Sequence, residues 1–281
     1  MDSRTRLYRE RFAGIDRLYG TGAALRLADR HVGVVGLGGV GSWAVEALAR
    51  SGVGKLTLID ADDVCLSNTN RQSHALDGQY GRGKGVVLAE RALAINPLLH
   101  VDVVPEFLVA ANMEAMLARG FDAVIDACDA VKTKIDLAAT CRRRKLPVVV
   151  VGSAGGRTDP TLVRVRDLSR TEHDALLALV RKRLRADHGF PRNPDRYFGI
   201  PAVYSMENVK FPQADGSVCG VNPELPPDAA MKLDCGGGLG AATHVTGAFA
   251  FAAVGRTLAL LLKPVGRVPA GGAPRNGEDP T

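Results

Sequence analysis

The amino-acid sequence predicts an α/β fold, a doubly wound, mostly parallel Rossmann-like sheet with helices on both faces and an antiparallel C-terminal extension. Short apolar runs of strand type lie at 31–36, 55–60, 121–128 and 147–152. They are separated by helix-type segments and do not alternate with polar residues, which is typical of strands buried on both faces. A glycine-rich loop follows the first run directly. These observations together indicate a fold of the dinucleotide-binding type.

The first two predicted strands enclose one helix. The strand at 31–36 leads through the glycine loop into a helix over 42–51, which Gly52 ends before the strand at 55–60. A unit of this length implies two parallel strands joined by a right-handed crossover.

The alternation of helix and strand then continues along the chain. Helices are expected at 83–95, 111–119 and 131–144, with a strand at 101–104 and two more at 121–128 and 147–152. The pattern changes after Gly156. Residues 161–168 alternate as an edge or antiparallel strand does, and 172–185 are helical in pattern.

Composition and cysteine usage narrow the class of protein. The chain has 281 residues, of which 46% are hydrophobic and 23% charged, as in ordinary globular proteins. Its five cysteines form no CxxC pair, which argues against a disulfide scaffold or a four-cysteine zinc site and fits the reducing cytoplasm. The N-terminus lacks the apolar stretch of a signal peptide. Residues 235–255 carry no charge, but their many glycines and few leucines favour a buried core helix over a membrane span.

Basic residues are concentrated in one part of the chain. The net charge is +6, yet the segment from Arg142 to Arg185 holds twelve Lys or Arg against four Asp or Glu. That segment has a local net charge of 12 − 4 = +8, which leaves −2 for the rest. A polyanionic partner and an ordinary solvated arginine-rich surface both fit this distribution.

The glycine loop predicts a site for a nucleotide phosphate. Its GxGxxG spacing is formed by Gly36, Gly38, Gly39 and Gly41, between a strand and a helix. Such glycines allow the backbone to approach a phosphate, which the N–H groups of the helix start then bind. Asp60 ends the next strand, where a carboxylate can bind ribose hydroxyls. The loop alone does not separate NAD, FAD, S-adenosylmethionine and ATP.

A polar, cationic segment after Asp60 favours ATP and adenylyl transfer. A nicotinamide enzyme needs one acidic residue here and then a helix. A triphosphate instead needs Arg, Lys and usually Mg²⁺ to neutralise the pyrophosphate that leaves. The candidate residues of this segment are Asp62, Ser67, Asn68, Arg71, Gln72 and Lys84.

The pattern GxGGxG, then DxDxVxxxNxxRQ, then a lysine about 12 residues on resembles the ThiF/MoeB/HesA family of E1-like adenylating enzymes. The resemblance continues through DACD at 126–129 and covers at least 10–155. It implies that Gly39 and Asp60 contact the nucleotide. It also implies that Asn68, Arg71 and Lys84 hold the phosphates.

The same resemblance implies that Asp129 carries Mg²⁺; a helix N-cap for 131–144 is the alternative role of this residue. ATP and Mg²⁺ are the implied cofactors, and a monovalent alkali cation is left open. The family forms homodimers in which an arginine enters the neighbouring subunit's site. Its usual position corresponds to Gly14, so Arg11 and Arg17 are both candidates.

Further segments resemble one branch of this family, the tRNA threonylcarbamoyladenosine dehydratases. They are RFAGIDRLYG, VCLSNTNRQSHAL, DLSRTEHDALLALVRKRLR, VYSMENVKFPQADGSVCG and MKLDCGGGLGAATHVTGAFAF. The resemblance then covers about 10–263 and implies ATP-dependent dehydration of threonylcarbamoyladenosine at position 37 of tRNA. It also implies, for some members, a cysteine desulfurase or sulfur-acceptor partner.

From these features we expect one E1-like adenylation domain over 1–263. It would hold an N-terminal helical segment at 1–30, a nucleotide-binding core at 31–156 and a substrate-facing extension at 157–263, with a disordered Gly/Pro-rich tail at 264–281. In the extension and before it, basic groups at 142–145 and 181–185 would track tRNA phosphates. Helical spacing places Arg181 and Arg185 on one face, where an anion would neutralise them.

The cysteines bear on the choice between substrates. Cys235, in the run DCGGG, is a candidate catalytic residue with Arg71, Lys84 and Asp129, although a buried thiol fits its surroundings equally. Cys65 and Cys128 have apolar neighbours and are expected in the core.

Three other functions remain open. An enzyme that adenylates the C-terminal glycine of a ubiquitin-like sulfur carrier usually has a cysteine in the crossover loop, and residues 142–218 contain none. An intramolecular cyclisation needs none, because its nucleophile is already tethered. A nicotinamide oxidoreductase and a non-catalytic RNA-binding scaffold are the remaining alternatives.

Overall fold

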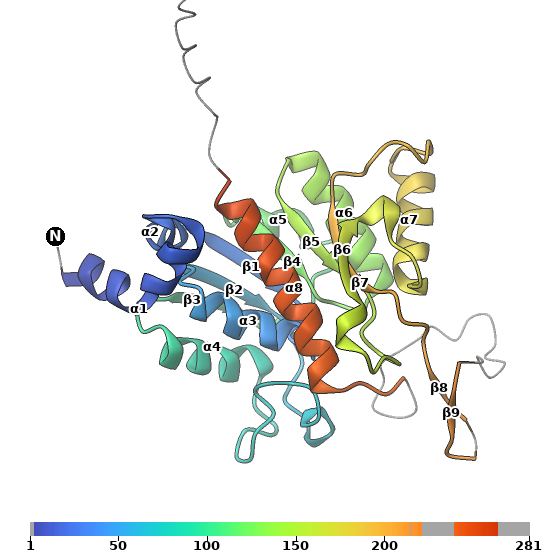
Figure 1. Cartoon of the computed structure of the whole chain (residues 1–281), viewed down its shortest axis with the longest axis horizontal. Coiled ribbons are helices and arrows are strands. Elements are labelled where there is room, and N and C mark those ends of the chain that lie inside the picture. The colour runs from blue at the N-terminus through green and yellow to red at the C-terminus, as the bar shows by residue number, and fades with distance from the viewer. Residues whose placement is uncertain (1–2, 214, 221–238, 264–281) are drawn as a thin grey trace, which may run out of the picture.

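The protein folds around one large sheet, as the sequence predicts. The computed structural model describes residues 3–213, 215–220 and 239–263. Its seven-stranded sheet has the order β3-β2-β1-β4-β5-β7-β6 (Figure 1). The strands are β1 (His31–Val35), β2 (Lys55–Ile59), β3 (His100–Val104), β4 (Ala123–Asp126), β5 (Val148–Val151), β6 (Val163–Asp167) and β7 (Pro201–Ser205). All neighbours run parallel except β6, which pairs antiparallel with β7.

The helices alternate with these strands. They are α1 (Ser3–Tyr19), α2 (Ala23–Ala28), α3 (Gly41–Arg50), α4 (Lys84–Ile95), α5 (Met113–Leu117), α6 (Val131–Arg144), α7 (Ala175–Asp187) and α8 (Thr243–Leu261). A small antiparallel sheet pairs β8 (Phe211–Pro212) with β9 (Val218–Cys219). The predicted doubly wound α/β class with its antiparallel C-terminal part is therefore confirmed.

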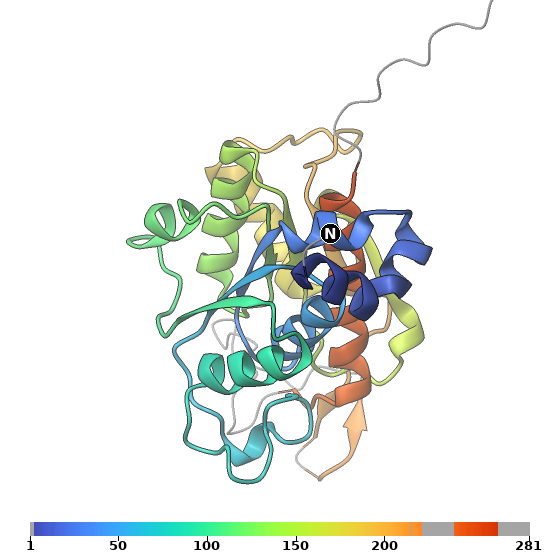
Figure 2. The same ribbon diagram turned by 90° about the vertical axis from the view of Figure 1, so that its left-hand side faces the viewer.

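Helices cover both faces of the large sheet. Alternate residues of β1 point to opposite sides, so Val32 and Val34 pack in one core with α3, α4 and α8. Val35 belongs to a second core, formed with α5, α6 and α7. Figure 2 shows α8 and α6 on opposite sides of the sheet. This two-sided burial explains the uninterrupted apolar runs of the sequence.

The apolar C-terminal segment forms a core helix. In the described part of the chain, α8 is the one helix long and apolar enough to cross a membrane by length and composition, and 56% of that stretch is buried inside the protein. Val245, Phe249 and Ala253 are fully buried in the core that α8 shares with the sheet. Figure 1 shows the helix lying across the sheet. α8 is therefore a buried core helix, as the sequence predicts.

The edge of the sheet was predicted in part. β6 is the expected antiparallel edge strand, but β7 beside it was not predicted. β7 has five residues, begins at Pro201 and follows a loop rich in Pro, Gly and Asn. Proline is tolerated at the first residue of a strand, where its missing N–H costs little.

The parallel strands bring the loops that follow them to one edge. β1, β2, β4 and β5 are parallel, so the loops that follow them lie at the same carboxyl edge. The order reverses between β1 and β4, and ligands of such sheets bind at this switch point. The predicted tail at 264–281 and Cys235 lie outside the described residues.

Candidate active site

The glycine loop turns tightly against the loop after β4. Gly36 has φ of 83°, and a Cβ on it would lie 2.8 Å from the backbone N of Cys128. A Cβ on Gly41 would lie 1.8 Å from the carbonyl oxygen of Gly36. A Cβ on Gly38 would instead meet no atom closer than 4.0 Å. A Cβ on Gly39 would lie 3.0 Å from Cγ2 of Thr246. The loop is thus closed toward the protein at Gly36, Gly39 and Gly41 and open at Gly38, three residues before α3 begins.

Asp60 joins the glycine loop to the segment after β2. One carboxylate oxygen accepts a 2.6 Å hydrogen bond from the N–H of Leu37, and the other accepts one of 2.9 Å from the N–H of Asp62. Asp60 is 9% exposed. Its predicted contact with a ribose stays a prediction, but its side chain lies at the mouth of the glycine loop as that role requires.

Asn68 shapes the segment that carries Arg71. It ends a short 3-10 helix (Leu66–Asn68), is 4% exposed, and its Oδ1 accepts the N–H of Cys65 at 3.1 Å. Its carbonyl oxygen accepts the N–H groups of Arg71 (3.0 Å) and Gln72 (2.9 Å). The side chain of Asn68 therefore holds the turn, and Arg71 is the group of this segment with donors to offer a phosphate.

The guanidinium of Arg71 is held within its own loop. Its Nη1 donates to the carbonyl oxygen of Ser67 (2.9 Å) and to Oδ1 of Asn70 (3.0 Å). Neither partner is a carboxylate, so among the described residues the positive charge has no anionic partner. An arginine in this state is suited to bind a polyphosphate.

The start of α8 braces the same loop. Thr243 Oγ1 donates to the carbonyl oxygen of Asn70 (2.6 Å), and Asn70 Nδ2 donates to the carbonyl oxygen of Ala241 (2.7 Å). Trp43 Nε1 of α3 donates to the carbonyl oxygen of Arg71 (3.1 Å). The sequence does not predict the two contacts of Asn70, because they join segments 171 and 173 residues apart.

Lys84 and Asp62 form an ion pair at the start of α4. Lys84 Nζ lies 2.7 Å from Asp62 Oδ2, and the Lys84 N–H donates to the carbonyl oxygen of Asp62 (3.0 Å). The Lys84 side chain is 8% exposed, whereas that of Asp62 is 52% exposed. Because the carboxylate faces solvent, a phosphate can take its place at the ammonium group.

Buried polar groups lie between these elements. Gln72 Oε1, Ser73 Oγ and both ring nitrogens of His74 have no hydrogen-bond partner among the described residues. Burial, and then the charges of Lys84 and Arg91, lower the pKa of His74 to about 4. His74 is therefore neutral at pH 7 and adds no further positive charge beside Lys84.

Asp129 projects from the loop after β4. It is exposed and makes no hydrogen bond or ion pair with the described residues. The N-cap position of α6 is Ala130, so Asp129 does not cap that helix. A free carboxylate at a phosphate site fits Mg²⁺, which is commonly held by one or two carboxylates and substrate phosphates. In the described ranges no group of three or more His, Cys, Asp or Glu could hold a metal ion.

The described cysteines differ from one another. Cys65 is exposed, so its expected place in the core is wrong; it directly precedes the 3-10 helix Leu66–Asn68. Cys128 is half-buried, and its thiol donates to Asp126 Oδ1 at 3.1 Å. Burial, and then the charge of Asp126, raise the pKa of Cys128 well above its usual value. Cys128 is therefore a protonated structural thiol.

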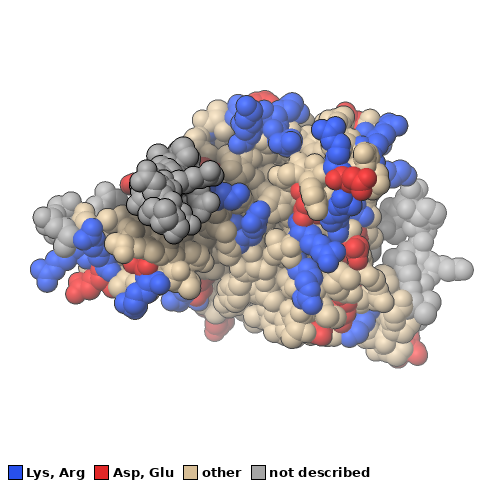
Figure 3. Space-filling model, turned by 45° about the horizontal axis from the view of Figure 1, so that its top comes forward, with Lys and Arg blue, Asp and Glu red and all other residues tan. Residues whose placement is uncertain are grey.

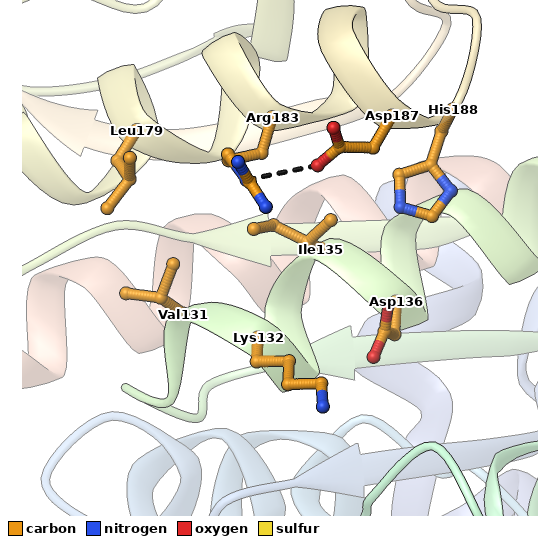
Figure 4. Close-up of a pocket in the computed structure, with 8 residues that line it drawn as sticks. All are labelled: Val131, Lys132, Ile135, Asp136, Leu179, Arg183, Asp187 and His188. Atoms are coloured by element: carbon orange, nitrogen blue, oxygen red, sulfur yellow. Dashed lines mark ion pairs between the residues drawn. The ribbon is translucent and has the colours of Figure 1, made fainter.

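A groove of about 510 Å³ lies between α6 and α7, beside the nucleotide loops rather than within them. It begins at Val131, two residues after Asp129. Val131 and Ile135 of α6 face Leu179 and Arg183 of α7, and Arg183 pairs with Asp187 at 3.0 Å (Figure 4). Its mixed rim and apolar floor could hold part of a substrate larger than a nucleotide.

Basic side chains of the segment 142–185 make more contacts within the protein than predicted. Arg181 Nη1 donates to Thr171 Oγ1, and Arg185 lies over the ring of Phe198 at 5.2 Å. Both side chains are half-buried. Burial, and then the nearby charge of Arg185, lower the pKa of Arg181, so the two lie close together on α7 as their spacing predicts, and the shared anion stays a prediction. Figure 3 shows basic side chains mixed with acidic ones rather than a continuous basic surface.

The match to a protein-family model supports the interpretation of this site as a nucleotide-binding site. The model described as the ThiF family matches residues 11–264. The chain belongs to the ThiF family. The glycine loop, the Arg71 segment, Lys84 and Asp129 thus lie in one continuous ThiF-family region.

Near-full-length relatives are tRNA-modifying enzymes. The chain is 46% identical over 260 residues to the tRNA threonylcarbamoyladenosine dehydratase of Escherichia coli, covering 92% of this chain and 96% of that one. It is 47% identical over 256 residues to the Haemophilus influenzae enzyme, covering 91% and 95%. The solved structure of the E. coli dehydratase in complex with ATP is similar at 44% identity, with a TM-score of 0.79 over 91% of this chain and 95% of that one.

Another ThiF-family relative matches only part of the chain. The E. coli molybdopterin-synthase adenylyltransferase is 39% identical over 123 residues, which is 44% of this chain and 49% of that one. The similarity to the dehydratases thus extends over a much larger part of the sequence.

Proposed function

We propose that this ThiF-family chain uses ATP to dehydrate N6-threonylcarbamoyladenosine at position 37 of tRNA, through a carboxyl-adenylate. The observation that carries the proposal is the 46% identity to a tRNA threonylcarbamoyladenosine dehydratase over 92% of the chain. The fold is consistent with it, since the glycine loop, the segment with Arg71 and Lys84, and the exposed Asp129 all follow strands at the carboxyl edge.

The first step would be adenylation. A carboxylate oxygen of the threonyl group attacks the α-phosphorus of ATP, and pyrophosphate leaves. Gly36, Gly38, Gly39, Gly41 and Asp60 would hold the nucleotide, with Asp62, Ser67, Asn68 and Gln72 shaping the phosphate side. Arg71 and Lys84 would neutralise the pyrophosphate, and Asp129 would hold Mg²⁺ on the phosphates.

The second step would close a ring. An atom of the ureido group on the same side chain attacks the activated carbonyl carbon, and AMP leaves with the former carboxylate oxygen. A proton from the ureido group is released, so the net change in the nucleoside is the loss of one water. Because the nucleophile is tethered to the acyl group, no thioester cysteine is required. A catalytic role for Cys235 stays a prediction.

A homodimer is part of this proposal. Arg11 Nη1 donates to the carbonyl oxygen of Ile95 at 2.8 Å and is thus used within its own chain. Arg17 is exposed and makes no hydrogen bond or ion pair with the described residues, which favours it as the arginine offered to a neighbouring subunit.

The proposed partner is tRNA, and the proposed compartment is the cytoplasm. Lys132 of α6 and Lys182 of α7 make no hydrogen bond or ion pair with the described residues and remain candidates for phosphate contacts. The alkali cation and the sulfur-transfer partner stay predictions.

The test is a pyrophosphate-release assay with ATP, Mg²⁺ and either threonylcarbamoylated or unmodified tRNA. Release that depends on the modified tRNA, together with a mass loss of one water from its nucleoside, would support the proposal. Absence of release with tRNA, combined with ATP–pyrophosphate exchange in the presence of a sulfur carrier ending in Gly-Gly, would move the substrate to protein.

A further inference from the structure

A fully buried ion pair lies behind the loop that carries Asp129. Lys134 Nζ, from the second turn of α6, is 2.9 Å from Asp126 Oδ1 at the end of β4, and both side chains are 0% exposed. Lys134 Nζ also donates to the carbonyl oxygen of Asp126 at 3.4 Å. Taking two charges out of water is costly, and apolar replacements of such pairs are often neutral or stabilising. A contribution to stability therefore does not by itself explain why the chain has this buried pair.

Asp126 anchors the turn that follows it. Its Oδ1 accepts the backbone N–H of Cys128 (3.3 Å) and the thiol of Cys128 (3.1 Å) besides the ammonium of Lys134. The glycine loop packs on the other side of this turn, since a Cβ on Gly36 would lie 2.8 Å from the Cα of Cys128. One carboxylate oxygen thus fixes the turn against which the phosphate loop rests.

Asp129 depends on this turn for its position. Its own side chain makes no hydrogen bond or ion pair with the described residues. Among the described residues, the direction of its carboxylate is therefore set only by the backbone of 127–129 and the start of α6. Displacing Asp126 Oδ1 would release that backbone.

Lys134 holds Asp126 in place through the 2.9 Å contact with its Oδ1. Burial alone would lower the pKa of Lys134, but the charge of Asp126 and, more weakly, that of Asp174 raise it above its usual value. Asp174 Oδ2 in turn accepts the N–H of Ser153 after β5 at 2.9 Å. The ammonium group therefore lies in an electrostatic network that spans the loops after β4 and β5.

We propose that Lys134 is a positioning residue for adenylation, which acts by holding Asp126 so that the 127–129 turn presents Asp129 to the phosphate site. The inference rests on the proposed function only in taking Asp129 as the residue that meets Mg²⁺ on ATP. Outer partners of metal-binding groups commonly contribute about 10- to 100-fold to metal affinity or activity.

Four variants of the full-length chain test the proposal. Lys134→Met leaves Asp126 unpaired, Lys134→Arg keeps a positive charge, and Asp126→Leu with Lys134→Met removes both charges. Arg30→Met is the matched control, because Arg30 pairs with Asp122 at 2.9 Å beside the opposite end of β4. For each we would measure the Tm and the Mg²⁺ concentration that half-saturates ATP binding without tRNA.

Lys134→Met should lower the Tm and raise the half-saturating Mg²⁺ concentration about tenfold. ATP affinity in the absence of Mg²⁺ should change less than about twofold, because Arg71 and Lys84 are untouched. The double variant should regain much of the Tm yet keep the raised Mg²⁺ requirement, since the acceptor for Cys128 is gone. Lys134→Arg should restore the Mg²⁺ requirement toward that of the wild type, and Arg30→Met should leave it unchanged.

The proposal would be overturned if the double variant regained both the Tm and the Mg²⁺ requirement of the wild type. This comparison remains possible even if Lys134→Met does not fold, because the double variant leaves no buried charge without a partner. An Asp129→Asn variant with an unaltered Mg²⁺ requirement would overturn it too. The measurement needs no tRNA, so a wild type that releases no pyrophosphate with modified tRNA would contradict the proposed function separately.

Discussion

Two lysines lie at the carboxyl edge of the sheet, each beside an aspartate, and their surroundings differ. Lys84 lies 2.7 Å from Asp62, whose side chain is 52% exposed. Lys134 lies 2.9 Å from Asp126, and there both side chains are 0% exposed. A phosphate arriving from solvent can replace Asp62 at Lys84, whereas no ligand of that size reaches Lys134.

The difference shows that a lysine–aspartate pair suits different roles depending on how deeply it is buried. An ion pair with one partner in solvent is screened on that side, so the exposed partner can be exchanged for a ligand at lower cost. A sealed pair cannot lose one partner without leaving a buried charge behind. The Asp62–Lys84 region is therefore suited to binding, and the Asp126–Lys134 region to holding the loops that bind.

The largest expected effect is on stability at the sealed pair. Asp126→Asn would leave the Lys134 ammonium buried without its counter-charge, at a cost of about 3–5 kcal/mol in the free energy of unfolding. Urea denaturation followed by circular dichroism would measure it. A loss no greater than that of an exposed pair would mean that water reaches Lys134, and the contrast between the two regions would fail.

The next effect is on rate at the open pair. Lys84→Met keeps the aliphatic stem but removes the charge that would meet the leaving pyrophosphate, so pyrophosphate release should slow by about 10²-fold or more. Arg71→Ala and Asp129→Ala should slow it similarly. The free energy of unfolding of Lys84→Met should fall little, because Asp62 stays solvated. Unchanged turnover in these variants would show that the site assignment is wrong.

A third effect is the pH dependence that His74 gives to the open region. The pKa of His74 is about 4 in the folded state and 6.5 ordinarily, so between these pH values the imidazole is protonated in the unfolded chain and neutral in the folded one. Stability from this group is complete above pH 6.5 and falls as the pH drops toward 4, by about 2 kcal/mol between pH 7 and pH 5. Urea midpoints of wild type and His74→Leu at both values would measure it; equal pH slopes would argue against a neutral buried imidazole.

The smallest expected effect is on stability at the open pair. Asp62→Asn removes a half-exposed carboxylate, and the free energy of unfolding should change by less than about 1 kcal/mol. The same urea titration used for Asp126→Asn gives a direct comparison of one chemical change at two sites. A loss of several kcal/mol here would mean that Asp62 holds the loop after β2 in place, rather than merely occupying a binding position.

Local pattern was enough to predict most of the fold. Apolar runs without alternation predicted the buried strands, because a sheet covered on both faces needs apolar residues at successive positions. The alternating run at 161–168 predicted β6 as an edge strand for the converse reason. β7 carries too short a signal after Pro201, and its place between β5 and β6 is set by pairing with strands distant in the sequence.

By itself the sequence determined the elements whose information is local: the glycine loop between strand and helix, Asp60 at the end of the next strand, and the spacing to Arg71, Lys84 and Asp129. Only the tertiary structure decided burial and partnership. It exposed Cys65, turned Arg181 and Arg185 inward and braced Asn70 with Thr243, 173 residues away. It also sealed Lys134 while leaving the partner of Lys84 in solvent. Burial and electrostatic environment depend on which distant segments pack together, and the periodicity of a single chain does not carry that information.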